Sequence, residues 1–154
     1  MYYKDYLENN EYENVFLTDC CDVTVASDPN KYIENEILYF CEDNLIVNNY
    51  NFAGIRFIDI CNTFYKIDNT EYNKIRNLKL LNMGVIGGRY DLIYLFLEKF
   101  EHFREACKNK SLNINMTAGN IIARVYFPIV MSGYPFCSRY KAYENRNDVG
   151  FIHK

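Results

Sequence analysis

The chain has 154 residues, of which 49% are hydrophobic and 24% are charged, so it can bury a core and is not expected to be disordered. Its net charge of -3, with acidic and basic residues interspersed, argues against a nucleic-acid-binding surface. No signal peptide opens the sequence and no apolar run reaches the roughly 18 residues of a membrane span, so we expect one intracellular domain over residues 1–154.

The first part of the chain mixes two patterns. Residues 2–16 are polar and aromatic and predict a short helix. Residues 18–26 are expected to form a loop or extended chain, and the β-branched residues at 23–25 favour a strand there.

A clear helix signal follows. Asp28 before Pro29 is typical of a helix start, because the carboxylate can cap free amides and proline suits the first turn. The apolar residues over 30–47 then recur at steps of three and four, which predicts an amphipathic helix. Residues 52–67 favour a helix over a strand, and 70–83 predict a shorter helix.

Two later segments, 90–107 and 119–131, are apolar on almost every side, which is the pattern of buried helices. A polar connection joins them, and neither is long enough to cross a bilayer. Together with the amphipathic segments, they predict an all-α fold: a helical bundle around a buried central helix hairpin.

The chemistry-bearing residues form no familiar motif. The six cysteines contain no CxxC pair, and His102 and His153 are the only histidines, so we expect reduced, mostly buried thiols, no metal ion and no cofactor. His102 has carboxylates around it in the sequence but no nucleophile. The glycine-rich stretch 84–88 lacks the lysine and hydroxyl of a phosphate-binding loop. No catalytic residue is predicted, and the chain is not expected to be an enzyme.

Gly88 and Arg89 stand directly before the helix predicted over 90–107. A positive charge at this end opposes the helix dipole, so the local structure does not explain the arginine. An arginine in such a place suits an ion pair with a carboxylate on a partner protein.

Two of these segments carry a family resemblance. Residues 88–96, Gly-Arg-Tyr-Asp-Leu-Ile-Tyr-Leu-Phe, resemble the first homology motif of Bcl-2-like proteins, and 128–133 resemble the second homology segment of the viral members. The helices expected at 30–47 and 52–65 match the family's first two helices, the second of which carries a BH3-like region. The chain therefore resembles a divergent viral Bcl-2-like apoptosis regulator of the large DNA virus type.

The resemblance covers residues 30–145 and leaves 1–28 as an N-terminal extension. The family's Asn-Trp pair is replaced by Ile86 and Gly87, and no C-terminal membrane anchor is seen.

The resemblance implies an inhibitor of apoptosis that sequesters the BH3-motif helix of pro-apoptotic Bcl-2 proteins, of the BH3-only or effector type, in a surface hydrophobic groove. Arg89 would pair with the aspartate of the bound helix. The implied ligand-binding residues are Gly88, Arg89, Tyr90, Ile93, Phe57, Ile60, Phe64, Ile75, Leu78 and Leu81. The family also implies the host-cell cytoplasm or the mitochondrion, and an exposed apolar groove favours a homodimer.

Three other interpretations stay open. The chain could be a Bcl-2-fold or other helical module that binds host signalling proteins without using a groove. Residues 86–96 also resemble the second helix of an ankyrin repeat, although no second copy follows at a spacing of about 33 residues. If 45–67 form a hairpin, the chain is a mixed α/β domain or a small enzyme.

Overall fold

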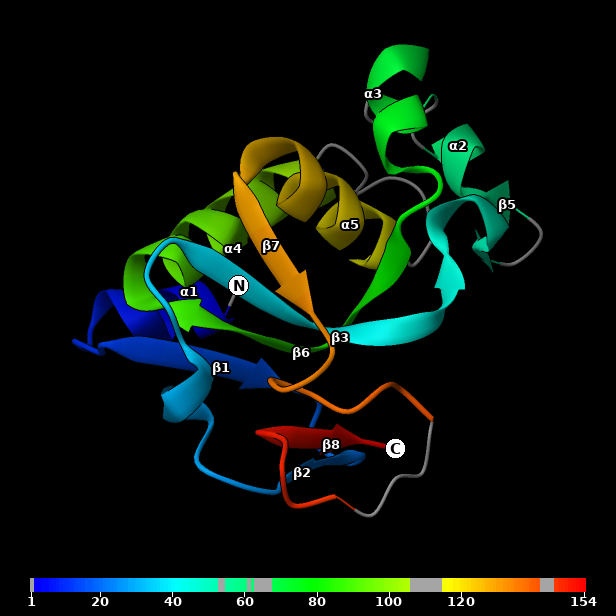
Figure 1. Cartoon of the computed structure of the whole chain (residues 1–154). Helices are drawn as coiled ribbons and strands as arrows, with labels where there is room; N and C mark the ends of the chain where they lie inside the picture. The colour runs from blue at the N-terminus through cyan, green and yellow to red at the C-terminus, as the bar shows by residue number, and fades with distance from the viewer. Residues whose placement is uncertain (1, 53–54, 61, 63–67, 106–114, 142–145) are drawn as a thin grey trace.

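The computed structural model describes residues 2–52, 55–60, 62, 68–105, 115–141 and 146–154, and it shows an α+β fold (Figure 1). Its centre is a four-stranded sheet with the order β1-β6-β3-β7, in which β7 runs parallel to β3 and the other pairs are antiparallel. Two small sheets, β2–β8 and β4–β5, accompany it.

The strands are β1 (Asn14–Thr18), β2 (Val23–Val25), β3 (Ile37–Ile46), β4 (Asn51–Phe52), β5 (Ile55–Arg56), β6 (Lys79–Arg89), β7 (Ile129–Ser132) and β8 (Phe151–His153). The helices are α1 (Tyr2–Glu8), α2 (Phe57–Ile60), α3 (Asn69–Ile75), α4 (Tyr90–Glu105) and α5 (Asn115–Tyr126), with the 3-10 helices η1 (Pro29–Tyr32) and η2 (Val47–Asn49).

The prediction of an all-α helical bundle is therefore wrong, and β3 shows the physical reason. The five successive residues from Ile37 to Cys41 are all buried, because both faces of the strand are covered. Such a strand is apolar at neighbouring positions, and its spacing cannot be told from that of a buried helix. The helix predicted over 30–47 is replaced by η1 and β3. The start signal itself is real, since the Asp28 carboxylate accepts a hydrogen bond from the Asn30 amide at 3.0 Å.

Helices α4 and α5 cover one face of the sheet (Figure 1). The rings of Phe96 on α4 and Phe40 on β3 meet with their centroids 5.6 Å apart. Helix α4 confirms the helix predicted over 90–107 as far as Glu105. Helix α5 confirms only part of 119–131, because a proline follows its last turn and β7 continues the segment.

A second core lies on the opposite face of the sheet. Alternate residues of β3 divide between the two cores, as the period of a strand requires. On this second face the ring of Phe136 lies 5.3 Å from that of Phe151 and 5.1 Å from that of Tyr39. Gly87 of β6 makes this approach possible, because a Cβ there would lie 2.6 Å from Cζ of Phe136. The glycine-rich stretch 84–88 is thus part of a strand.

The second core also contains a disulfide bond between Cys41 and Cys137, two fully buried residues whose Cα atoms are 5.2 Å apart. The expectation of reduced thiols is wrong for this pair. Cys20 and Cys21 are free and exposed, with their sulfur atoms 3.3 Å apart. The hydrogen bond between the two thiols raises the pKa of Cys21.

The middle of the chain also departs from the predicted pair of helices. Strands β4 and β5 pair with each other, and the described residues of the helix predicted over 52–67 contain the four-residue helix α2. Positions 53–54, 61 and 63–67 lie outside the described residues. Helix α3 confirms the start of the helix predicted over 70–83, whose second half belongs to β6. A mixed α/β domain with a hairpin in this region was the alternative that the sequence left open.

The N-terminal segment is part of the central fold. Helix α1 confirms the short helix predicted within residues 2–16, and β2 confirms the strand at 23–25. Strand β1, which lies within this segment, pairs with β6 along its whole length and so belongs to the central sheet. Over the described part of the chain, no helix has both the length and the apolar content that crossing a bilayer requires.

Candidate functional site

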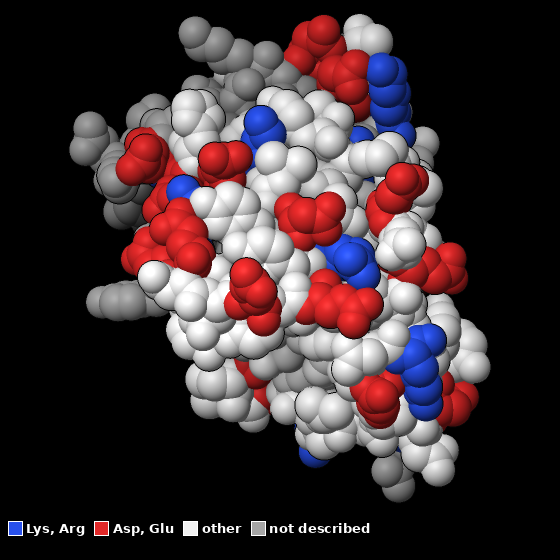
Figure 2. Space-filling view, turned by 90° about the vertical axis from the view of Figure 1, so that its left-hand side faces the viewer, with Lys and Arg blue, Asp and Glu red and all other residues white. Residues whose placement is uncertain are grey.

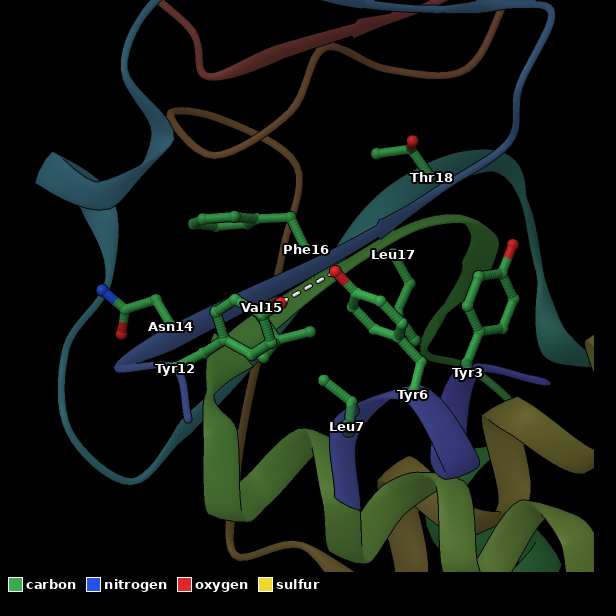
Figure 3. Close-up of a pocket in the computed structure, with 9 residues that line it drawn as sticks. All are labelled: Tyr3, Tyr6, Leu7, Tyr12, Asn14, Val15, Phe16, Leu17 and Thr18. Carbon is green, nitrogen blue, oxygen red and sulfur yellow. Dashed lines mark hydrogen bonds between the residues drawn. The ribbon is translucent and has the colours of Figure 1, made fainter. Parts of the chain in front are cut away.

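A groove with a volume of about 590 Å³ runs between helix α1 and the edge strand β1. Figure 3 shows Tyr3, Tyr6 and Leu7 facing the strand from α1, and Tyr12 beside them on the connection to β1. The strand contributes all five of its residues to the lining. The groove is thus built from a helix and a strand that are neighbours in the sequence, and its walls are mainly apolar and aromatic.

Helix α1 is held in place by helix α4. Leu7 is buried at 3% exposure in the main core, and the Tyr90 hydroxyl donates a hydrogen bond to its carbonyl oxygen at 3.2 Å. The Tyr94 hydroxyl donates to the Glu8 carboxylate at 2.7 Å. This hydrogen bond, together with the negative charge of Glu8, raises the pKa of Tyr94 to about 12. The wall that α1 forms is therefore anchored by contacts on the side away from the groove.

Tyr6 and Tyr12 form an aromatic ridge along the groove. Their rings are stacked with centroids 6.2 Å apart, and the Tyr12 hydroxyl donates to the Tyr6 hydroxyl at 2.9 Å, as the dashed line in Figure 3 marks. This hydrogen bond raises the pKa of Tyr12. Tyr6 is nevertheless 60% exposed and Tyr12 41%. Large exposed aromatic surface that also carries hydroxyl groups is typical of protein-binding sites.

The outer edge of β1 is open. Two hydrogen bonds show which residues of this segment bond to β6. The Tyr90 amide donates to the Glu13 carbonyl at 3.0 Å, and the Asp19 amide donates to the Gly84 carbonyl at 2.8 Å. Because antiparallel ladders alternate, the odd-numbered residues of β1 direct their backbone groups to β6. The even-numbered residues Asn14, Phe16 and Thr18 direct theirs outward. Among the described residues, no backbone group pairs with this outer edge of β1. Such a row of amides and carbonyls is a template for a further strand.

The surroundings of the groove are acidic. Figure 2 looks onto the left-hand side of Figure 1, where α1 and β1 lie, and shows more acidic than basic side chains on that face. Within residues 2–19 the single basic residue is Lys4, which lies 3.7 Å from Glu101 on α4. A second hollow of about 660 Å³ adjoins the groove at Tyr12, and its lining includes Glu8 and Glu11. The electrostatic potential at the groove therefore favours a positively charged ligand.

The predicted ligand-binding residues that the structure describes do not line one groove. Arg89 pairs with Glu13, with Nη1 3.0 Å from Oε1, so its carboxylate partner comes from within the chain. Leu81 and Ile93 are fully buried in one core, with Gly88 buried beside Ile93.

The remaining predicted residues are spread over other elements. Tyr90 is partly buried against the main core, Ile75 is buried in a separate small core, and Leu78 is exposed. Phe57 and Ile60 lie on α2 with side chains outside the described part, and Phe64 lies outside the described residues. Inhibition of apoptosis stays a prediction from the sequence resemblance alone.

The edge-strand groove was not found from the sequence. The signal for it was Asn14–Thr18, whose β-branched and aromatic residues alternate between the two faces of a strand. Two of them, Val15 and Leu17, point to the main core, whereas Phe16 belongs to the second core.

Comparisons with known proteins add no family to this geometry. No protein-family model matches the chain, and no curated protein matches it. The interpretation of the site therefore rests on its own residues.

Proposed function

We propose that the chain is a binding protein that takes up an extended, basic segment of a partner protein as an added strand on the edge of β1. The observation that carries this proposal is that the outward-directed backbone groups of Asn14, Phe16 and Thr18 lie along the same edge as an apolar groove. In strand addition, main-chain hydrogen bonds provide affinity, and pockets for alternate side chains provide specificity.

The acidic surroundings support a basic segment. The apolar side chains of the segment would enter the groove, and a lysine or arginine in the part of the segment that runs past Tyr12 would face the carboxylates there. Exposed charges of this kind mainly raise the association rate and exclude acidic competitors. Binding is therefore expected to weaken as the ionic strength rises.

A designed peptide probe tests the proposal directly. A fluorescein-labelled octapeptide of four Lys-Val repeats is titrated with the chain, and its anisotropy is followed. We expect saturable binding of this peptide and none of the matching Glu-Val peptide. N-methylation of alternate residues removes the amide donors along one edge of the peptide. We expect the affinity to fall by at least about tenfold, which corresponds to the loss of one or more hydrogen bonds. Equal affinity of the methylated peptide would reject strand addition.

Two variants locate the binding. Thr18→Pro removes an outward-directed amide while leaving the ladder with β6 intact, so it should abolish binding of the Lys-Val peptide without unfolding the chain. Tyr6→Ala should weaken binding, whereas Tyr134→Ala should not, although both tyrosines are 60% exposed. An unchanged affinity in Thr18→Pro would contradict the proposal.

The oligomeric state is the remaining control, because an open edge strand can also pair with a second copy of the chain. Sedimentation velocity at the concentrations of the titration should show a monomer. A dimer that Thr18→Pro converts to a monomer would show that the edge serves self-association, and the basic-segment proposal would then be rejected.

A further inference from the structure

Three side chains that can bind a metal ion converge beyond the end of β1. Asp19 follows β1 directly, Asp22 directly precedes β2, and His153 ends β8, the partner of β2. One ligand atom from each of the three lies within 4.8 Å of the others. The backbone fixes this meeting, because the Asp19 amide donates to the Gly84 carbonyl and the Lys154 amide donates to the Asp22 carbonyl, both at 2.8 Å. Figure 1 shows β2 and β8 side by side, next to the end of β1.

His153 distinguishes this cluster from an ordinary pair of surface carboxylates. Its side chain is only 2% exposed, and in the part of the chain that the structure describes neither ring nitrogen has a hydrogen-bond partner. Its Nε2 is 3.4 Å from Oδ2 of Asp22, a contact that does not satisfy hydrogen-bond geometry. Buried polar atoms are nearly always paired, so this nitrogen calls for a ligand that the protein does not itself supply.

Gly84 of β6 keeps this space free. A Cβ at that position would lie 2.6 Å from Nε2 of His153 and 2.8 Å from Oδ2 of Asp19. Only glycine therefore lets the imidazole and the carboxylate approach the same point of the strand. The cluster adjoins a cavity of about 460 Å³, whose lining also includes the polar side chains of Asp43, Asn82 and Tyr140.

We infer that Asp19, Asp22 and His153 form a binding site for a divalent transition-metal ion of the zinc type. One imidazole and two carboxylates suit an ion of intermediate hardness, whereas Mg²⁺ prefers oxygen ligands and several waters. Bonds of about 2.0–2.2 Å place tetrahedral ligands about 3.4 Å apart, which is the separation already present between His153 and Asp22. Three protein ligands beside a cavity leave a fourth position for water or another ligand.

Isothermal titration of the chelator-treated full chain with ZnCl₂ tests the inference. We expect one ion per chain, and a loss of affinity in Asp19→Asn, Asp22→Asn and His153→Gln that exceeds the about 10–100-fold effect of removing an outer partner of a ligand. His102→Gln is the matched control, because His102 is an exposed histidine on α4 and should leave binding unchanged. Zinc should raise the melting temperature of the unaltered chain and of His102→Gln, but not that of the three site variants.

The free thiols supply the competing explanation, because Cys20 and Cys21 lie between the two aspartates and thiolates bind zinc strongly. Binding should persist in Cys20→Ser/Cys21→Ser, and its loss there would overturn the inference. If His153→Gln does not fold, Asp19→Asn and Asp22→Asn decide the question, because Asp19 is exposed and Asp22 is partly exposed. Unchanged zinc affinity in these two variants, or no binding by the unaltered chain at 100-micromolar zinc, would also overturn it. The site is independent of strand addition at β1, and neither result predicts the other.

Discussion

The carboxamide of Asn120 on α5 and the backbone of Leu81 on β6 exchange two hydrogen bonds that tie the helical layer to the sheet. The Leu81 amide donates to Oδ1 of Asn120 at 2.8 Å, and Nδ2 of Asn120 donates to the Leu81 carbonyl at 2.9 Å. Strand β1 ends opposite Val85, so it does not reach Leu81. The side chain of Asn120, fully buried, supplies the bonds that a neighbouring strand would otherwise make.

Replacing Asn120 by alanine should therefore leave both backbone groups of Leu81 unsatisfied in the core. We expect a loss of about 2–4 kcal/mol in the free energy of unfolding, measured by urea denaturation. Asn73→Ala on α3 removes an exposed asparagine and should change stability by less than about 0.5 kcal/mol. A loss below about 1 kcal/mol for Asn120→Ala would show that water replaces the carboxamide.

Phe96→Ala should be among the most destabilising core substitutions. The ring is 1% exposed and meets those of Phe40, Phe100 and Phe127 at centroid distances of 5.6, 5.8 and 6.1 Å. Truncation leaves a cavity and should cost about 3–5 kcal/mol. Leu95→Ala is the neighbouring control, because Leu95 is 39% exposed and its truncation should cost less than about 1 kcal/mol. Similar losses of stability in the two variants would contradict the finding that the Phe96 side of α4 is buried and the Leu95 side is exposed.

The disulfide bond between Cys41 and Cys137 spans 96 positions of the sequence, so it should restrict the unfolded chain strongly. Peptide mapping of the unreduced chain should recover these two cysteines linked. We expect Cys41→Ala/Cys137→Ala to lower the free energy of unfolding by about 2–5 kcal/mol. Cys20→Ala/Cys21→Ala should leave it nearly unchanged, since both thiols are exposed. Recovery of Cys41 with an alkylated thiol from the unreduced chain would refute the bond.

The contact between Tyr94 and Glu8 predicts a pH dependence at the alkaline end. The pKa of Tyr94 in the folded chain is about 12, above the ordinary value of 10.0, so the folded state favours the protonated hydroxyl. Its contribution to stability is complete below pH 10 and is lost as the pH rises to about 12. Carbon-13 spectra of labelled tyrosine should show this late titration, and Glu8→Gln should shift it toward the ordinary value. A resonance of Tyr94 that titrates near pH 10 in the unaltered chain would contradict the hydrogen bond.

The sequence by itself determined the features that depend on near neighbours. The cap at Asp28, the short helix α1, the strand β2 and the long helix α4 were predicted from local residue types: a capping carboxylate, a polar and aromatic segment, β-branched residues and a long apolar segment. The prediction that this helix is buried on every side is wrong, because one side of α4 packs on the sheet and the other, with Leu95 39% exposed, faces water. Interactions between residues close in the sequence determine these elements, so the sequence alone predicts them.

Only the tertiary structure decided that β3, β6 and β7 are strands. Their apolar runs are compatible with buried helices until distant segments cover and pair them, and β3 pairs with residues as far along the chain as Ile129–Ser132. The groove required the edge of β1 to stay open, which depends on the strand order. The cluster of Asp19, Asp22 and His153 required β8 to return beside β2 from the far end of the chain. Residues that meet only through long-range pairing leave no local signal, which is why the sequence predicted no metal site.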